Sequence, residues 1–178
     1  MINEKIEAAL NKQVNAEMYS SYLYLSMASY FQSINLEGAA NWMKIQALEE
    51  MYHGMKIHGY LEERGGRFIA EAIDKPASDW DSPLAAFEAV YQHEQKVTGL
   101  ISDLLNLAIE LKDHASNSFL QWFISEQVEE EATADGIVQR IKLAGPQGSG
   151  MFMIDRELGL RVFNLPADIK LAIQPSKI

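Results

Sequence analysis

With 178 residues, of which 48% are hydrophobic, the chain can bury one good core and hardly a second. It contains no cysteine, which excludes disulfides and thiolate metal sites and makes a reducing cytoplasm the expected compartment. A net charge of -10 disfavours nucleic acid as a partner, and no apolar run approaches the length that crosses a membrane.

Helical periodicity predicts two long helices at the start of the chain, over about 3–33 and 37–64, with Gly65-Gly66 ending the second. The following segment, 67–81, has no helical period and contains Pro76. About 16 extended residues reach roughly 50 Å, which matches the roughly 45 Å length of a 30-residue helix. The segment can therefore cross the length of a bundle, so that the second and third helices run parallel.

Ser82-Pro83 is a typical helix start, with an N-cap followed by proline at the first helical position. The third helix is predicted from there to about Lys112, and Asp113 is predicted to cap a fourth helix that reaches about Ala144. These two helices and the first two are expected to form an all-α four-helix bundle.

A stretch rich in glycine and proline, 145–150, separates the bundle from a short fifth helix predicted over Met151 to Leu160. Two parts of the chain are therefore expected. Residues 1–145 form the bundle, and 146–178 hold a loop, the short helix and a C-terminal tail.

Acidic residues interrupt the apolar stripes of all four long helices. The third helix has a single acid, Glu94, in a heptad stripe that is otherwise apolar. Each uncompensated buried charge would cost roughly several kcal/mol. The inward-facing carboxylates carry four negative charges, which two divalent cations would cancel: Glu17, Glu50, Glu94 and Glu130.

The same polar pattern occurs twice, 77 residues apart. Glu17 and the Glu-x-x-His of Glu50 and His53 are matched by Glu94 and by Gln127-x-x-Glu130. In both copies the midpoint between the two helices falls near the expected turn, so all positions share one level halfway along the bundle. A repeated ligand pattern of this kind indicates one two-metal site built from two similar halves.

This set of residues resembles the ferroxidase centre of non-haem ferritins, most closely those of the prokaryotic branch. The resemblance includes the stretches 15–24, 126–131 and 154–158 and extends to about Arg161. It implies a ferritin-like bundle with a long crossover between helices two and three, plus a short C-terminal helix. It also implies two irons per subunit, held by five residues: Glu17, Glu50, His53, Glu94 and Glu130.

Further roles follow from the same resemblance. Glu50 would bridge the two irons, and Gln127 would form a hydrogen bond near the site without binding metal. Tyr24 matches a family tyrosine that can donate an electron, although packing alone also explains it. Three acids match a weaker third iron site, or else form an exposed acidic patch: Glu49, Glu126 and Glu129.

The function implied is oxidation of Fe(II) to Fe(III), with O2 or H2O2 as oxidant, and storage of ferric mineral in a homo-oligomeric cage of 24 subunits. The rival is a soluble di-iron oxygenase or peroxidase, which would not need the fifth helix. A haem-binding bacterioferritin would carry Glu-x-x-His in both halves, so no haem is expected, although Met51 stands where such proteins place their haem ligand. A purely structural bundle would leave the buried acids uncompensated.

Overall fold

The computed structural model describes residues 2–145 and 149–164, and every regular element in these ranges is a helix. The helices are α1 (Glu4–Ser33), α2 (Glu37–Glu63), α3 (Pro83–Glu110), α4 (His114–Ala144) and α5 (Ser149–Leu158). The predicted all-α bundle with a short fifth helix is confirmed. Part of the predicted second segment, at 146–148 and 165–178, lies outside the described residues. Among the described helices, none combines the length and apolarity that a membrane span requires.

Local side chains and backbone angles set the helix ends. The side chains of Ser82 and Asp113 accept hydrogen bonds from the backbone N–H three residues on, at 3.1 and 3.0 Å. Asn3 caps α1 by accepting from the N–H two residues on, at 2.9 Å. The turn after α1 places Asn35 at a φ of 61°, and Gly65 after α2 has a φ of 73°. The predicted ends of the four long helices differ from these by no more than two residues, because the capping residues stand outside the helices.

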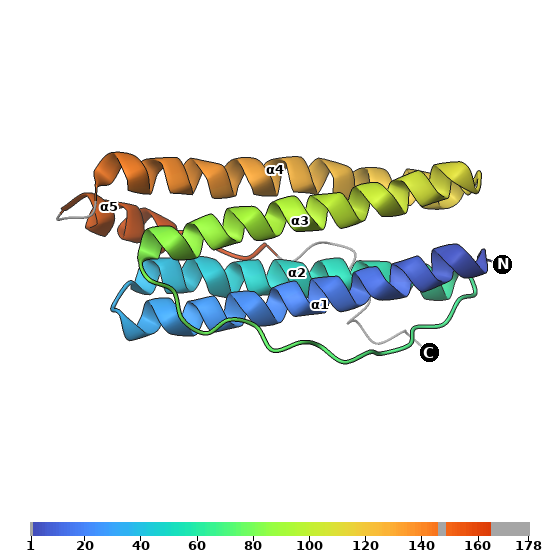
Figure 1. Ribbon diagram of the computed structural model, residues 1–178, viewed down its shortest axis with the longest axis horizontal. Coiled ribbons are helices and arrows are strands. Elements are labelled where there is room, and N and C mark those ends of the chain that lie inside the picture. Colours follow the sequence, from blue (N-terminus) through green and yellow to red (C-terminus); the bar gives the residue numbers. More distant parts are fainter. Residues whose placement is uncertain (1, 146–148, 165–178) are drawn as a thin grey trace, which may run out of the picture.

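The four long helices form two hairpins, α1 with α2 and α3 with α4 (Figure 1). The crossover between α2 and α3 runs back along α1, so that α2 and α3 are parallel, as predicted (Figure 1). The side chain of Asn11 bonds to the crossover twice, to the Arg67 carbonyl at 3.0 Å and the Ile69 N–H at 2.7 Å. Ser26 donates to the carbonyl of Ala77 at 2.6 Å. These side chains fix an extended segment against the bundle.

A polar layer divides the core into two hydrophobic clusters. One cluster includes Phe31 and Phe87 at the α5 end, and the other includes Leu10 and Leu120 at the opposite end. Of the four carboxylates predicted to face inward, Glu17, Glu50 and Glu94 are buried and Glu130 is half-buried. Between the clusters lie buried polar residues from all four long helices: Gln13, Glu17, Gln46, Glu50, His53, Glu94 and Gln127.

Helix α5 docks on the start of α2 through direct backbone contact. The Asp155 side chain accepts a hydrogen bond from the Ala39 N–H at 2.8 Å, within the first turn of α2. Gly38 lies against α5 so closely that a Cβ there would be 1.6 Å from the Asp155 carbonyl oxygen. The helix runs two residues earlier than predicted, because the chain turns at Gly159, another glycine in contact with Gly38.

Replacing Gly38 with alanine should therefore lower the thermal unfolding midpoint, with a loss of about 1–3 kcal/mol from overpacking. In an open helix position the same change would instead add roughly 0.5–1 kcal/mol of stability. Gly59→Ala is the matched control, since a Cβ at this glycine, also in α2, meets nothing within 4 Å. Equal midpoints for the two variants, followed by circular dichroism, would contradict the docking of α5 on Gly38.

Candidate metal centre

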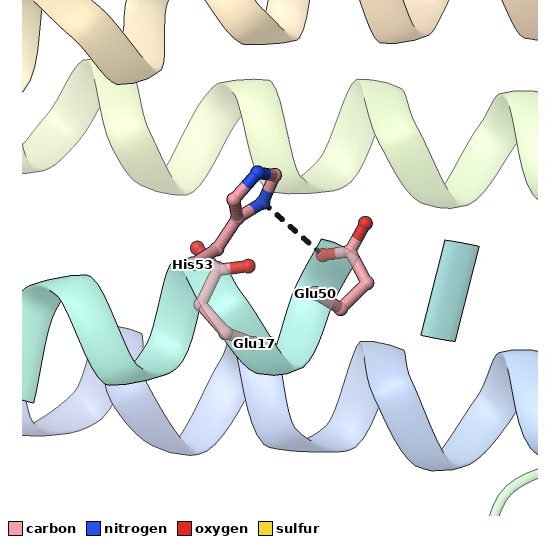
Figure 2. A group of neighbouring side chains, drawn as sticks. All are labelled: Glu17, Glu50 and His53. Atoms are coloured by element: carbon pink, nitrogen blue, oxygen red, sulfur yellow. Dashed lines mark ion pairs between the residues drawn. The ribbon is translucent and has the colours of Figure 1, made fainter. Parts of the chain in front are cut away.

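The structure brings five predicted ligand residues together in two groups that share Glu50. Glu17, Glu50 and His53 form one group, and Glu50, Glu94 and Glu130 form the other. Within each group one potential ligand atom per residue lies within 4.8 Å of the others. Figure 2 shows Glu17 from α1 and the α2 pair turned toward a common space, with His53 Nδ1 3.8 Å from a Glu50 oxygen. The geometry would allow two adjacent cation sites that share one carboxylate.

Three glutamine side chains bond to these carboxylates. Gln13 donates to Glu17 at 2.8 Å and Gln46 donates to Glu50 at 3.1 Å. Gln127 donates to Glu94 Oε2 at 3.3 Å and also reaches the Glu94 carbonyl. The bond from Gln127 is in keeping with its predicted role. The roles of the other two were not predicted, although a glutamine four residues before a glutamate in one buried stripe is a readable signal.

Tyr24 lies inside the same layer. It is fully buried, and its hydroxyl donates a hydrogen bond to Glu94. Burial, reinforced by the charge of Glu94, raises the pKa of Tyr24 well above its ordinary value. The phenol therefore stays protonated and holds one Glu94 oxygen, while Gln127 holds the other.

Two further aromatic groups border the centre, and nothing in the sequence singled them out. The ring of Trp122 packs edge-on against His53, with centroids 5.4 Å apart. His93 bonds to Ser20 at 2.8 Å and contacts the Tyr24 ring, and burial lowers its pKa to about 4. The imidazole of His93 is therefore neutral and adds no positive charge to the layer.

Three carboxyl groups of this layer, Glu17, Glu50 and Glu130, have raised pKa values in the absence of cations. Burial raises the pKa of Glu17, although His53 and Gln13 act in the opposite direction. Burial also raises the pKa of Glu50 well above the ordinary value, and the charges of Glu94 and Glu17 add to the effect. The pKa of Glu130 is raised well above the ordinary value for the same reason, with Glu50 and Glu94 adding to burial.

Two buried oxygens in the layer lack a hydrogen-bond partner among the described residues, Glu17 Oε2 and Glu130 Oε2. Buried acceptors of this kind are costly unless something positive satisfies them. One of these two oxygens belongs to each ligand group. Carboxylates with one imidazole are a donor set that suits iron, manganese or zinc, so the residues present fit a pair of such cations.

The three acids predicted to form a weaker site are arranged differently. Glu49, Glu126 and Glu129 all line one cavity of about 270 Å³ beside the centre, but they are not among the groups with ligand atoms within 4.8 Å. Burial raises the pKa of Glu49 and of Glu126. The Glu49 carboxylate is engaged by Arg161, which follows α5. The three acids therefore share one cavity, but their carboxylate oxygens do not form a group as close as those of the main centre.

Known proteins resemble this chain closely. A family model described as a ferritin-like domain matches residues 7–144. A bacterial non-heme ferritin from Bacteroides fragilis is 47% identical over 161 residues, which make up 90% of this chain and 100% of the relative. A bacterial non-heme ferritin from Campylobacter jejuni is 38% identical over 156 residues, which make up 88% of this chain and 93% of the relative. An open-pore ferritin from the archaeon Archaeoglobus fulgidus has a TM-score of 0.90 and 52% identity, over 91% of this chain and 99% of that one.

The raised pKa of Glu50 predicts how the stability of the metal-free protein depends on pH. The folded chain keeps a proton that the unfolded chain releases above 4.5, the ordinary carboxyl pKa. The free energy of unfolding therefore falls as pH rises from that value through the raised pKa of the folded state. Glu50→Gln removes one such group and should raise the unfolding midpoint of the chelator-treated protein near neutral pH, by the equivalent of about 1 kcal/mol or more.

The advantage of Glu50→Gln should shrink as pH is lowered toward 4.5 and vanish below it, where the wild-type carboxyl group is protonated in both states. Glu63→Gln, which changes an exposed glutamate on the same helix, is the control and should follow the wild type. Thermal scans at several pH values would contradict the raised pKa if Glu50→Gln and wild type differed by the same amount throughout.

Proposed function

The chain belongs to the ferritin family, and we propose that its central polar layer is where this protein binds and oxidises iron. It is an iron-storage ferritin with ferroxidase activity, which converts Fe(II) to Fe(III), and its relatives are the bacterial non-heme ferritins. The resemblance noted in the sequence is thereby confirmed. The observation that carries the assignment of the site is the pair of ligand groups that share Glu50.

In the proposed centre, Glu17, Glu50 and His53 bind one iron as substrate. Glu50, Glu94 and Glu130 bind the second. Two divalent ions would balance the four carboxylates in a core where each uncompensated charge is unfavourable. The orphaned oxygens of Glu17 and Glu130 support this assignment, because each belongs to a different group.

The surrounding residues prepare the ligands for this chemistry. The hydrogen bonds from Gln13 and Gln46 hold Glu17 and Glu50, and those from Tyr24 and Gln127 hold Glu94. Anionic oxygen ligands favour Fe(III) over Fe(II), which promotes loss of electrons to the oxidant. Two adjacent irons give up two electrons together, so an oxidant such as O2 or H2O2 receives an electron pair. Tyr24, in contact with Glu94, can supply one electron more.

We further propose a third, weaker iron site at Glu49, Glu126 and Glu129. These acids line the same cavity as His53, so an ion held there would lie beside the main centre. Their greater exposure compared with Glu17, Glu50, His53 and Glu94 supports a lower affinity, since water screens the charges.

The protein self-assembles into a homo-oligomer, as ferritins do. We propose a closed cage of 24 subunits in the cytoplasm. Several large apolar side chains on α1 and α2 support the burial of this face against other subunits, because they are exposed in the single chain. They are Tyr22, Leu25, Leu48, Met51 and Met55. The presence of α5 supports a cage rather than a soluble di-iron oxygenase, because an oxygenase would need only the four-helix bundle to hold its metal ions.

The proposed centre predicts the effect of Glu50→Ala. This change removes a ligand from both irons, so the initial rate of Fe(II) oxidation should fall about 100-fold or more, since even outer-shell changes at metal sites cost 10–100-fold. The bundle should still fold, because a buried acid is being removed. Stopped-flow absorbance of ferric products measures the rate, and circular dichroism verifies the fold. A rate equal to that of the exposed-site control Glu63→Ala would contradict the assignment.

The cage predicts the behaviour of the protein after aerobic loading with a large molar excess of Fe(II). Size-exclusion chromatography should show protein and iron eluting together, at about 480 kDa for 24 chains of 20.0 kDa. Far more iron should travel with the protein than its ligand sites hold. Truncation after Gly150 removes most of α5 and should weaken assembly or iron retention. Elution as a monomer or dimer, with precipitated iron, would favour the di-iron oxygenase.

A further inference from the structure

Arg161 ties the end of α5 to the middle of α2. Its guanidinium donates to Gln46 Oε1 at 2.8 Å and to the carboxylate of Glu49, and it lies 4.6 Å from the ring of Trp42. Its backbone carbonyl accepts a hydrogen bond from Asn41 at 3.0 Å. In Figure 1 the segment after α5 turns back along the bundle from the α5 end. Both the main chain and the side chain of Arg161 are therefore anchored on α2.

This anchor acts on one of the three acids of the proposed third iron site. The guanidinium is a permanent positive charge whose planar N–H groups match a carboxylate. The contact is partly exposed, with 25% of the Arg161 side chain and 28% of the Glu49 side chain accessible. A metal ion that bound Glu49 through Oε2 would have to compete with the guanidinium for this oxygen, and the guanidinium charge would repel it.

We propose that Arg161 is a built-in counter-cation of the third site, which holds Glu49 in the metal-free subunit and is displaced when a metal ion binds there. The inference rests on the proposed third site at Glu49, Glu126 and Glu129. It explains why these acids share a cavity and yet are not drawn together to ligand distance. Arg161 touches no ligand of the two main sites, so it is a positioning residue.

Displacement of the Arg161 guanidinium would affect two parts of the structure. Gln46 accepts from Arg161 through Oε1 and donates to Glu50 through its amide nitrogen, so the guanidinium fixes the amide that orients the shared carboxylate. The segment that follows Arg161, at 162–164, lines the same cavity as the three acids. Metal binding at the third site is therefore coupled to the Glu50 carboxylate and to the C-terminal end of the described chain. The coupling is reciprocal, as linkage requires.

Anaerobic calorimetric titration of the metal-free assembled protein with Fe(II) tests the competition. Arg161→Gln should bind the third Fe(II) more tightly, by up to about fivefold, the range expected for one partly exposed ion pair. The first two equivalents should still bind, because all five ligands of the main centre are kept. Arg161→Lys keeps the charge but loses the planar guanidinium, so its affinity for the third Fe(II) should lie between those of wild type and Arg161→Gln. Arg140→Gln is the matched control, because it breaks an exposed arginine pair between α4 and α5, with Glu157, away from the cavity.

Hydrogen exchange gives a second readout that does not depend on oxidation. With Zn(II) as a redox-inert probe, exchange in residues 159–164 of the wild type should speed up as the third equivalent binds. In Arg161→Gln the same residues should exchange fast from the start and change little on binding. If Arg161 served packing alone, Zn(II) would leave wild-type exchange at 159–164 unchanged, and this result would overturn the proposal.

The variant Glu129→Ala tests the third iron site separately from the role of Arg161. Loss of one bound Fe(II) in this variant, together with tighter binding in Arg161→Gln, supports both the third site and its counter-cation. Loss of one ion in Glu129→Ala with wild-type affinity in Arg161→Gln overturns the role of Arg161 and leaves the third site standing. Unchanged stoichiometry in Glu129→Ala removes the third site and with it the inference, while the main centre is judged separately by Glu50→Ala.

Discussion

Four carboxylates at one level of a buried core cannot all be ionised unless cations lie among them, and the rest of the molecule is arranged around this constraint. The polar layer interrupts the hydrophobic core, so the bundle is stabilised by one apolar cluster on each side of it. Without cations the layer keeps protons, as the raised pKa values of Glu50 and Glu130 indicate. With two divalent ions the same carboxylates become ligands, so protons and metals compete for one set of groups.

The hydrogen bonds of the layer explain how such a site can be occupied and emptied again. Glutamine amides contact Glu17, Glu50 and Glu94, and an amide carries no charge, so it orients a carboxylate without competing with a cation for electrostatic balance. Arg161, at the rim, differs because it brings a full charge to Glu49. Fixed neutral donors in the centre and a charged donor at the edge suit a protein that binds iron, oxidises it and releases it to a store.

Much of the fold could be predicted because it depends on local sequence patterns. The heptad stripes gave the inward faces of the long helices, and Ser82 and Asp113 marked helix starts by capping chemistry that depends only on neighbouring residues. The repeat at 77 residues placed Glu17 and Glu94 at one level, since hairpin geometry converts equal spacing into equal height. The ferritin resemblance then supplied metal roles that spacing alone does not assign.

What the sequence did not reveal depends on contacts between distant segments. The backbone approach of Gly38 to Asp155 fixes where α5 docks, and no periodic pattern records it. The reach of Arg161 to Glu49 likewise spans 112 residues and depends on the turn after α5. The bond of Gln13 to Glu17 is local, but its importance became visible only once Glu17 was seen to be buried.

Anomalous diffraction at the iron absorption edge, on crystals soaked anaerobically with Fe(II), is the most direct test of the paired site. Two strong peaks are expected in every subunit. One should lie among Glu17, Glu50 and His53, and the other among Glu50, Glu94 and Glu130, with Glu50 in contact with both. A layer without anomalous signal, in crystals where iron is found only at surface acids, would contradict the claim that these buried carboxylates exist to bind two metal ions.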